Sequence, residues 1–157
     1  MDARLDLSTS PTFGAFGRHL VAADRALAAS TLPRSTQELV KLRASQINGC
    51  GFCTDMHGKD AVHAGETWER LNLVAAWREA TVFTAAERAA LELAEQGTRV
   101  ADAAGSVTDE AWENAARYYD EEQLAALVCV IALVNAFNRG NLIVRQPAGS
   151  YRPGHAG

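Results

Sequence analysis

The sequence predicts an all-α protein that folds as one compact domain of about seven helices. Apolar residues recur every three or four positions along most of the chain, and the alternating pattern of a strand is almost absent. Helix-capping residues precede several of the apolar segments. The 157 residues are 48% hydrophobic and 22% charged, a balance with which a single domain can fill a core. We therefore treat residues 1–157 as one domain.

The same signals place the helices in order. Ser35 and Glu38, and later Thr84 and Glu87, have the spacing of a capping box, in which two side chains satisfy free backbone N–H groups at a helix start. Glycine or proline follows several of the apolar segments and is expected to end them. The segment 146–157 is rich in glycine and proline and is expected to be a mobile tail. The expected helices span 13–29, 35–48, 50–64, 68–79, 84–100, 108–119 and 120–140.

Composition argues against several classes of partner. The net charge is −4 and no run of basic residues is present, so neither nucleic acid nor an anionic membrane surface is expected to bind. The first ten residues, MDARLDLSTS, lack the apolar stretch of a signal peptide. The longest apolar run, 124–134, is shorter than a bilayer-spanning helix. The expected location is the cytoplasm.

The last expected helix is unusually apolar. Between Leu124 and Phe137 only Asn135 is polar, and a helix that is apolar on every side is expected to be buried on every side. A domain of this size has too little core to cover it, so part of this helix, or a face beside it, is expected to lie in a homo-oligomer interface. Cys129 is expected to be buried within it as a small hydrophobe. Three tryptophans are likewise expected to pack in the core: Trp68, Trp77 and Trp112.

Four residues carry the chemistry of the chain: Glu38, Cys50, Cys53 and His57. Two thiols separated by two residues at a helix start can form a disulfide, and the positive end of the helix favours the thiolate. In a reducing compartment such a pair is typical of a catalytic or metal-binding site rather than of a structural disulfide. On a helix, Cys50, Cys53 and His57 share one face. Glu38 reaches them only from a preceding helix packed against this one.

These residues also allow other interpretations. Glu38 is explained equally well as the acidic member of the Ser35 capping box. The two thiols, the imidazole and the carboxylate could together hold a zinc ion, although structural zinc more often takes two separate ligand pairs. The dithiol could also be a redox sensor that is oxidised without turnover. The usual haem attachment is excluded, because Thr54 rather than histidine follows Cys53.

The motif Glu-x11-Cys-x2-Cys-x3-His, with its flank INGCGFCTDMHGKDA, resembles the alkylhydroperoxidase D family within the carboxymuconolactone decarboxylase-like superfamily. The resemblance is clearest over residues 35–100. It implies an all-helical, alkylhydroperoxidase D-like fold that assembles as trimers or hexamers. It also implies thiol-dependent reduction of organic hydroperoxides. The decarboxylase branch is less expected, since it typically lacks the paired cysteines.

The resemblance also assigns roles. It implies that Cys53 attacks the peroxide, that Cys50 resolves the product as a disulfide, and that Glu38 and His57 relay protons. A lipoyl- or thioredoxin-like dithiol would then reduce the disulfide, and no other cofactor is implied. The helix-dipole argument favours the other order, because Cys50 is nearer the helix start and would ionise more easily.

One position departs from the family pattern. Well-characterised members have a histidine immediately before the second cysteine, where this chain has Phe52. Phenylalanine carries no protons, so the relay is expected to run through Glu38 and His57 alone, or the substrate differs from a lipid-like peroxide. Alternatively, Phe52 lines an apolar substrate pocket.

Overall fold

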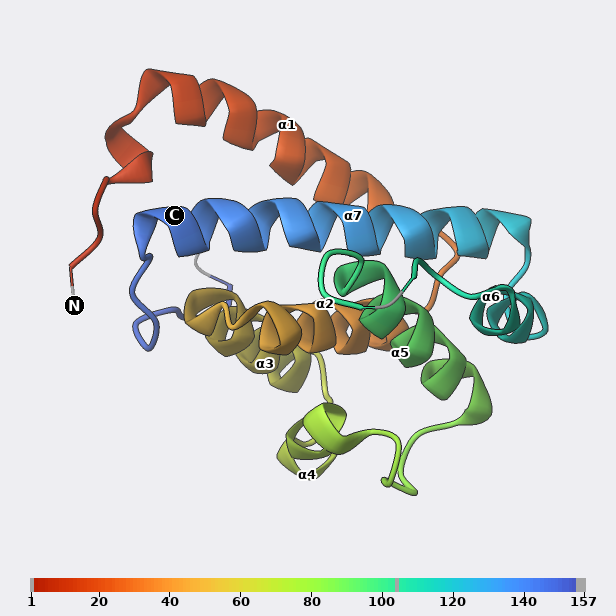
Figure 1. Ribbon diagram of the computed structural model, residues 1–157. Coiled ribbons are helices and arrows are strands. Elements are labelled where there is room, and N and C mark those ends of the chain that lie inside the picture. Colours follow the sequence, from red (N-terminus) through yellow and green to blue (C-terminus); the bar gives the residue numbers. More distant parts are fainter. Residues whose placement is uncertain (1, 104, 155–157) are drawn as a thin grey trace.

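The computed structural model describes residues 2–103 and 105–154, and within these residues it contains helices and no strand. The all-α prediction is therefore confirmed (Figure 1). Two short 3-10 helices, Leu7–Thr9 and Val74–Ala76, accompany the α-helices. The α-helices are α1 Pro11–Ala28, α2 Arg34–Asn48, α3 Gly51–His63, α4 Trp68–Leu73, α5 Ala85–Thr98, α6 Asp109–Ala116 and α7 Glu121–Val144.

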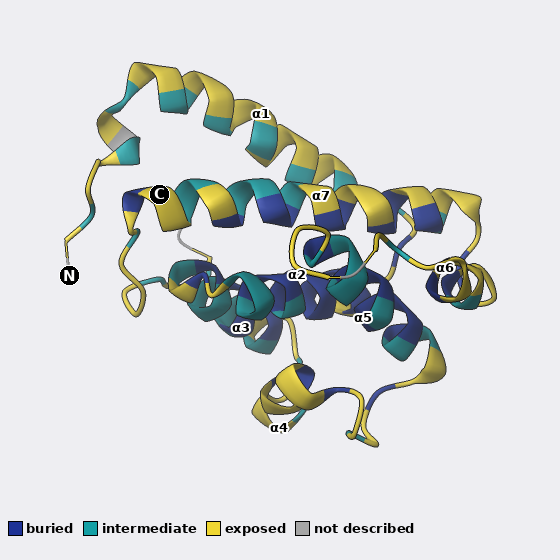
Figure 2. Cartoon of the chain, in the orientation of Figure 1, coloured by how far each residue is buried: buried dark blue, intermediate teal, exposed yellow. Residues whose placement is uncertain are grey.

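Helix α2 is the centre of the molecule and packs against α3, α5 and α7. Its apolar residues face two sides: Val40 packs in a cluster with α5 and α7, whereas Leu39 and Leu42 pack in a second cluster with α3 and the α4 region. Figure 2 shows this central helix and α5 as the most deeply buried elements. Several polar side chains of α2 are consequently buried as well, Glu38 and Lys41 among them, and these need polar partners inside the protein.

One of the two expected capping boxes forms. Thr84 and Glu87 bond reciprocally at the start of α5. At α2 the expectation is wrong, because Pro33 is the N-cap residue and Ser35 lies inside the helix. Proline has no N–H and an extended backbone here, so the helix begins directly after it. Glu38 is thereby free to make other contacts.

Helices α1 and α7 lie side by side at one edge of the molecule (Figure 1). None of the 18 residues of α1 is buried, and Figure 2 shows its outer side as exposed. Helix α7 continues past Gly140 to Val144 and ends where Arg145 adopts the left-handed conformation, with φ 57°. By length and composition alone this 24-residue helix is able to cross a membrane, a test that the core helix of a soluble protein also passes. Its contacts with α1, α2 and α5 make it a core helix of this fold.

Three expectations about burial are wrong in the single chain. Cys129 is exposed because the inner face of α7 is formed by Leu127, Val130 and their neighbours. Trp68 and Trp112 are 51% and 42% exposed. Trp77 is buried as expected. The fourth helix is also shorter than expected, since α4 ends at Leu73 and a 3-10 turn replaces its second half.

The segment after α7 folds back over α3. Lys59 Nζ donates to the carbonyl oxygens of Gly149 and Tyr151, both at 3.2 Å. The hydroxyl of Tyr151 donates to Asp60 Oδ1 at 2.7 Å, and its ring meets the ring of Phe52 edge-on. Mobility of this tail stays a prediction, and its residues 155–157 lie outside the described residues.

Candidate active site

The junction between α2 and α3 sets the position of the two thiols. Gly49 ends α2 in the left-handed conformation, with φ 70°, which glycine adopts without a steric penalty. The chain then reverses, and Cys50 becomes the N-cap residue of α3. Its Sγ accepts a hydrogen bond from the backbone N–H of Cys53 at 3.4 Å. The capping geometry, rather than the helical spacing used above, therefore holds Cys50 beside Cys53.

Cys53 is fully buried and is surrounded by hydrogen-bond donors. Asn141 Nδ2 of α7 donates to its Sγ at 3.3 Å. The pKa of Cys53 is lowered to about 6, first because the thiol of Cys50 hydrogen-bonds to it and then because of the amides of Asn141 and Asn138 and the charge of His57, which together outweigh burial. A thiol with this pKa is mainly thiolate at neutral pH, and the thiolate is the nucleophilic form.

Cys50 behaves in the opposite way. Its pKa is raised, because its thiol hydrogen-bonds to Cys53 and because it is buried. The helix-dipole expectation that Cys50 ionises first is therefore wrong for this geometry. Only one of the two thiols ionises readily. Cys53 is that thiol, because the side-chain amides of Asn141 and Asn138 in α7 hydrogen-bond to its sulfur.

Glu38, the remaining residue of the predicted four-residue motif, reaches the site from α2. Its Oε2 lies 3.5 Å from Nδ1 of His57, and its Oε1 lies 2.8 Å from Arg34 and 3.6 Å from Lys41. Burial alone would raise its pKa, but the hydrogen bond with His57 and the charges of Lys41 and Arg34 lower it. An ionised carboxylate thus lies beside the imidazole, an arrangement that orients a histidine ring. The structure brings together all four residues of the predicted motif.

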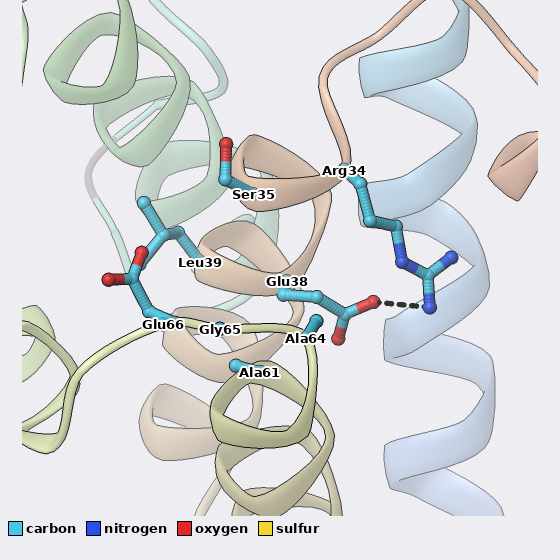
Figure 3. A pocket seen from close by; sticks show the side chains of 8 residues that line it. All are labelled: Arg34, Ser35, Glu38, Leu39, Ala61, Ala64, Gly65 and Glu66. Carbon is cyan, nitrogen blue, oxygen red and sulfur yellow. Dashed lines mark ion pairs between the residues drawn. The ribbon is translucent and has the colours of Figure 1, made fainter. Parts of the chain in front are cut away.

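Glu38 also connects the buried imidazole with a small cavity of about 200 Å³ between α2 and α3 (Figure 3). Figure 3 shows its carboxylate directed toward the guanidinium of Arg34, with Ala61 of α3 and Ala64, which directly follows α3, nearby. The Arg34 side chain is 49% exposed. The Glu38–His57 pair therefore extends from the interior of the site to the edge of the solvent.

A larger cavity of about 750 Å³ is lined mainly by residues of α1, α3 and α7. Most of its wall is apolar, but it includes His57 and also Asn141, whose amide donates to Cys53 Sγ. Phe52 is part of the wall, at the position that the sequence suggested for an apolar substrate pocket. The apolar wall residues are Leu7, Phe13, Val21, Phe52, Met56, Leu133, Val134 and Phe137.

The sequence reasoning missed the asparagines of α7. Asn135, Asn138 and Asn141 recur every three residues at the end of the longest apolar run of the chain, so they lie toward one side of the helix, and this was the available signal. Asn138 is fully buried; it accepts from Asn48 Nδ2 at 2.8 Å and donates to Ser45 Oγ at 3.1 Å. This network fixes α7 against the end of α2, directly behind the cysteines.

The zinc interpretation receives no geometric support from the described part of the chain. No group of three or more His, Cys, Asp or Glu side chains is placed there to hold a metal ion. The Glu38 carboxylate is instead engaged by Arg34 and Lys41.

Solved structures share this fold. A structure from Agrobacterium tumefaciens, described as a protein of unknown function and proposed as the antioxidant defence protein AhpD, superposes with a TM-score of 0.86. It is 32% identical over 96% of this chain and the whole of that chain. The debrominase Bmp8 superposes with a TM-score of 0.78 at 19% identity, over 92% of this chain and 75% of that one, and shares the fold alone. The architecture is thus that of AhpD-like helical proteins.

Sequence comparison gives the family. Residues 14–96 match the model of the carboxymuconolactone decarboxylase family. The uncharacterized protein YdfG of Bacillus subtilis is 41% identical over 121 residues, which cover 77% of this chain and 81% of that protein. The chain belongs to the carboxymuconolactone decarboxylase family and is of the AhpD-like kind. The matched segment contains Glu38 through His57 but ends before α7, which carries Asn141.

Proposed function

We propose that the protein is a thiol-dependent peroxidase that reduces organic hydroperoxides through a Cys50–Cys53 disulfide. One observation carries the proposal: a buried Cys53 thiol whose pKa is lowered to about 6, next to a second thiol that can trap its oxidised form. The AhpD-like fold and the antioxidant role proposed for the relative from Agrobacterium support the same chemistry.

The reaction follows from the order of ionisation. The Cys53 thiolate attacks the terminal oxygen of the hydroperoxide, the O–O bond breaks, and the alkoxide leaves as the alcohol after taking a proton. Cys53 is now a sulfenic acid. The Cys50 thiol attacks its sulfur, the S–O bond breaks, and water leaves as the disulfide forms. One hydroperoxide and two thiols thus yield one alcohol, one water and one disulfide.

The Glu38–His57 pair has a defined part in this scheme. His57 passes to the leaving alkoxide the proton that it needs, and the ionised Glu38 beside Nδ1 orients the imidazole for this transfer. With phenylalanine at position 52, this pair is the whole relay. The apolar cavity next to His57 favours a hydroperoxide with a hydrocarbon body over hydrogen peroxide.

The test is consumption of cumene hydroperoxide and of hydrogen peroxide with dithiothreitol as reductant, together with the mass of the intact protein before reduction. We expect turnover, faster with cumene hydroperoxide, and a two-hydrogen mass loss that maps to Cys50 and Cys53. Cys53→Ser is expected to abolish turnover and His57→Ala to slow it. Cys129→Ser, which removes the exposed third thiol, is the matched control and is expected to stay active.

Two results would contradict the proposal. Loss of activity in Cys129→Ser would place the reactive thiol elsewhere. Formation of the disulfide without turnover, with lipoyl-type and thioredoxin-type dithiols as well as dithiothreitol, would indicate a redox sensor rather than a peroxidase.

A further inference from the structure

A second cavity, of about 370 Å³, is lined by Cys50 and not by His57. It is formed by the α2–α3 junction, the end of α7 and the segment that follows α7. Phe52, Asn141 and Gln146 line both this cavity and the larger one, so they separate the two. The residues of the second cavity are Gly49, Cys50, Gly51, Phe52, Asn141, Leu142, Arg145, Gln146, Pro147 and Ala148.

The two cavities offer access to different parts of the site. His57 lines the larger cavity, and Cys50 lines the second. Cys53 is fully buried and lines neither of the two, and Asn141, which lines both, donates to its sulfur. A thiol that reduces the disulfide attacks one of its sulfurs, and access decides which one. Of the two cysteines, Cys50 is the one that lines a cavity, so we expect attack on its sulfur.

The chemistry favours the same direction of attack. The sulfur that is not attacked leaves as a thiolate, and a thiol of lower pKa leaves faster. Attack on Cys50 releases Cys53, whose thiolate accepts the hydrogen bond from Asn141 Nδ2 at 3.3 Å. Attack on Cys53 would instead release Cys50, whose sulfur accepts a hydrogen bond from the backbone N–H of Cys53 at 3.4 Å, whereas the Cys53 thiolate is stabilised by the side chains of both Asn141 and Asn138.

The cavity also restricts the attacking molecule. A volume of about 370 Å³ fits a small molecule or a flexible arm, and the 2% exposure of Cys50 keeps its sulfur out of reach of a flat protein surface. Among the described residues that line the cavity, Arg145 is the sole charged one. It is exposed and lies at the C-terminal end of α7. A cation at the rim of a small cavity attracts anions.

We infer that the second cavity is the entrance for the reductant, a small thiol carrying a negative charge, which attacks Sγ of Cys50 while the hydroperoxide enters through the larger cavity. The inference rests on the proposed function, because it concerns the reduction of the disulfide formed there. The reductant thiolate forms a bond with Cys50 Sγ, the Cys50–Cys53 bond breaks, and Cys53 leaves as the thiolate. A second thiol then attacks the sulfur of the bound reductant, and Cys50 leaves and takes up a proton. Two thiols are oxidised to one external disulfide and the protein disulfide is reduced.

The first experiment separates the two half-reactions. The disulfide is prepared with diamide, without any peroxide, and its reduction is followed by alkylation and mass measurement. Leu142→Trp narrows the second cavity and Val21→Trp narrows the larger one; both positions are partly exposed, at 40% and 45%. Leu73→Trp, at the end of α4 and 38% exposed, lines neither cavity and is the matched control.

Leu142→Trp is expected to slow reduction of the disulfide about tenfold, equivalent to about 1.4 kcal/mol in the barrier, and to affect oxidation by cumene hydroperoxide much less. Val21→Trp is expected to show the reverse pattern, and Leu73→Trp to resemble the unmodified protein in both. Equal rates of reduction in Leu142→Trp and Leu73→Trp would overturn the inference.

The second experiment tests the charge. The disulfide is reduced with 2-mercaptoethanesulfonate, 2-mercaptoethanol and cysteamine, which are similar in size and are anionic, neutral and cationic. Ratios of the rates between unmodified protein and variant cancel the intrinsic reactivity of each thiol. Arg145→Glu is expected to slow the anionic thiol, leave the neutral one nearly unchanged and accelerate the cationic one. Equal effects on all three would overturn the inference.

Failure of the proposed function is distinguishable from failure of this inference. If cumene hydroperoxide leaves the thiols unoxidised, the peroxidase proposal is wrong, whereas the diamide-formed disulfide still reports on the entrance.

Discussion

The ionisation of Cys53 depends on side chains that are distant in the sequence. Asn141 donates to its sulfur from 88 residues away, and the thiol of Cys50 is the largest single cause of its lowered pKa. A lowered pKa means that the thiolate is present above about pH 6 and is lost as the pH falls through that value. Removal of either donor therefore shifts the titration to higher pH.

We expect Cys50→Ala to raise the pKa of Cys53 furthest and Asn141→Leu to raise it by a smaller amount. The measurement is the thiolate absorbance near 240 nm as a function of pH, in a Cys129→Ser background that removes the exposed thiol. A midpoint that stays near pH 6 in both variants would show that neither neighbour stabilises the thiolate.

Glu38 gives a second prediction at this scale. Glu38→Gln keeps the size of the side chain but removes the charge beside Nδ1 of His57, 3.5 Å away. We expect oxidation by cumene hydroperoxide to slow by about a hundredfold, the lower end of the usual range for acid–base assistance, because Glu38 acts through His57. The measurement is a single-turnover rate, with circular dichroism to monitor the fold.

Arg34→Gln is the control for Glu38→Gln. It removes the partner of the other carboxylate oxygen, and the Arg34 side chain is already 49% exposed. We expect it to retain most of the oxidation rate. Equal losses in the two variants would indicate that Glu38 acts through the ion pair and the local structure rather than through His57.

The sequence motif predicted which side chains lie close together in the site, but only part of the interactions between them. Cys50, Cys53 and His57 are close in sequence, so local geometry brings them together. Which cysteine ionises first could not be predicted in the same way, because it depends on Asn138 and Asn141. These residues belong to α7, and no local sequence pattern links that helix to the cysteines. The reactivity itself stays a prediction until it is measured.

At the scale of the helices, identical sequence signals had different outcomes. The Thr84–Glu87 capping box forms, whereas Ser35–Glu38 has the same spacing and does not. Pro33 decides the second case, because it occupies the N-cap position and the helix begins before Ser35. The prediction that the last helix ends at Gly140 is wrong for a similar reason. Gly140 is tolerated inside the long, packed α7, and the helix ends where Arg145 adopts the left-handed conformation.

The two patterns give a matched test of stability. Thr84→Ala removes a formed N-cap bond and is expected to lower the free energy of unfolding by about 1 kcal/mol. Ser35→Ala removes no cap, and alanine is the better helix former, so it is expected to change that free energy by less than about 0.5 kcal/mol. Urea unfolding monitored by circular dichroism measures both. Equal losses would mean that Ser35 stabilises the start of α2 after all.

At the scale of the whole molecule, one edge remains uncovered in the single chain. None of the 18 residues of α1 is buried, and α7 is apolar on its outer side as well as on its inner side. Val128 is 46% exposed and Ile143 is 68% exposed. The expectation that α7 is buried on every side therefore holds for only one side within one chain, and a second copy would have to supply the rest.

We accordingly expect a light-scattering mass that is a multiple of the 16.8 kDa chain at micromolar concentration. Val128→Glu places a charge on the uncovered face of α7 and is expected to shift the mass toward one chain, because burying an unpaired carboxylate costs several kcal/mol. Val100→Glu, at a position 54% exposed just after α5, is the matched control and is expected to leave the mass unchanged. Cys129 neighbours Val128 and is exposed in the single chain, so its alkylation should be slow in the assembled protein and fast in Val128→Glu. A mass of 16.8 kDa for the unmodified protein, with rapid alkylation of Cys129, would show that this edge faces solvent and that the apolar outer side of α7 needs another explanation.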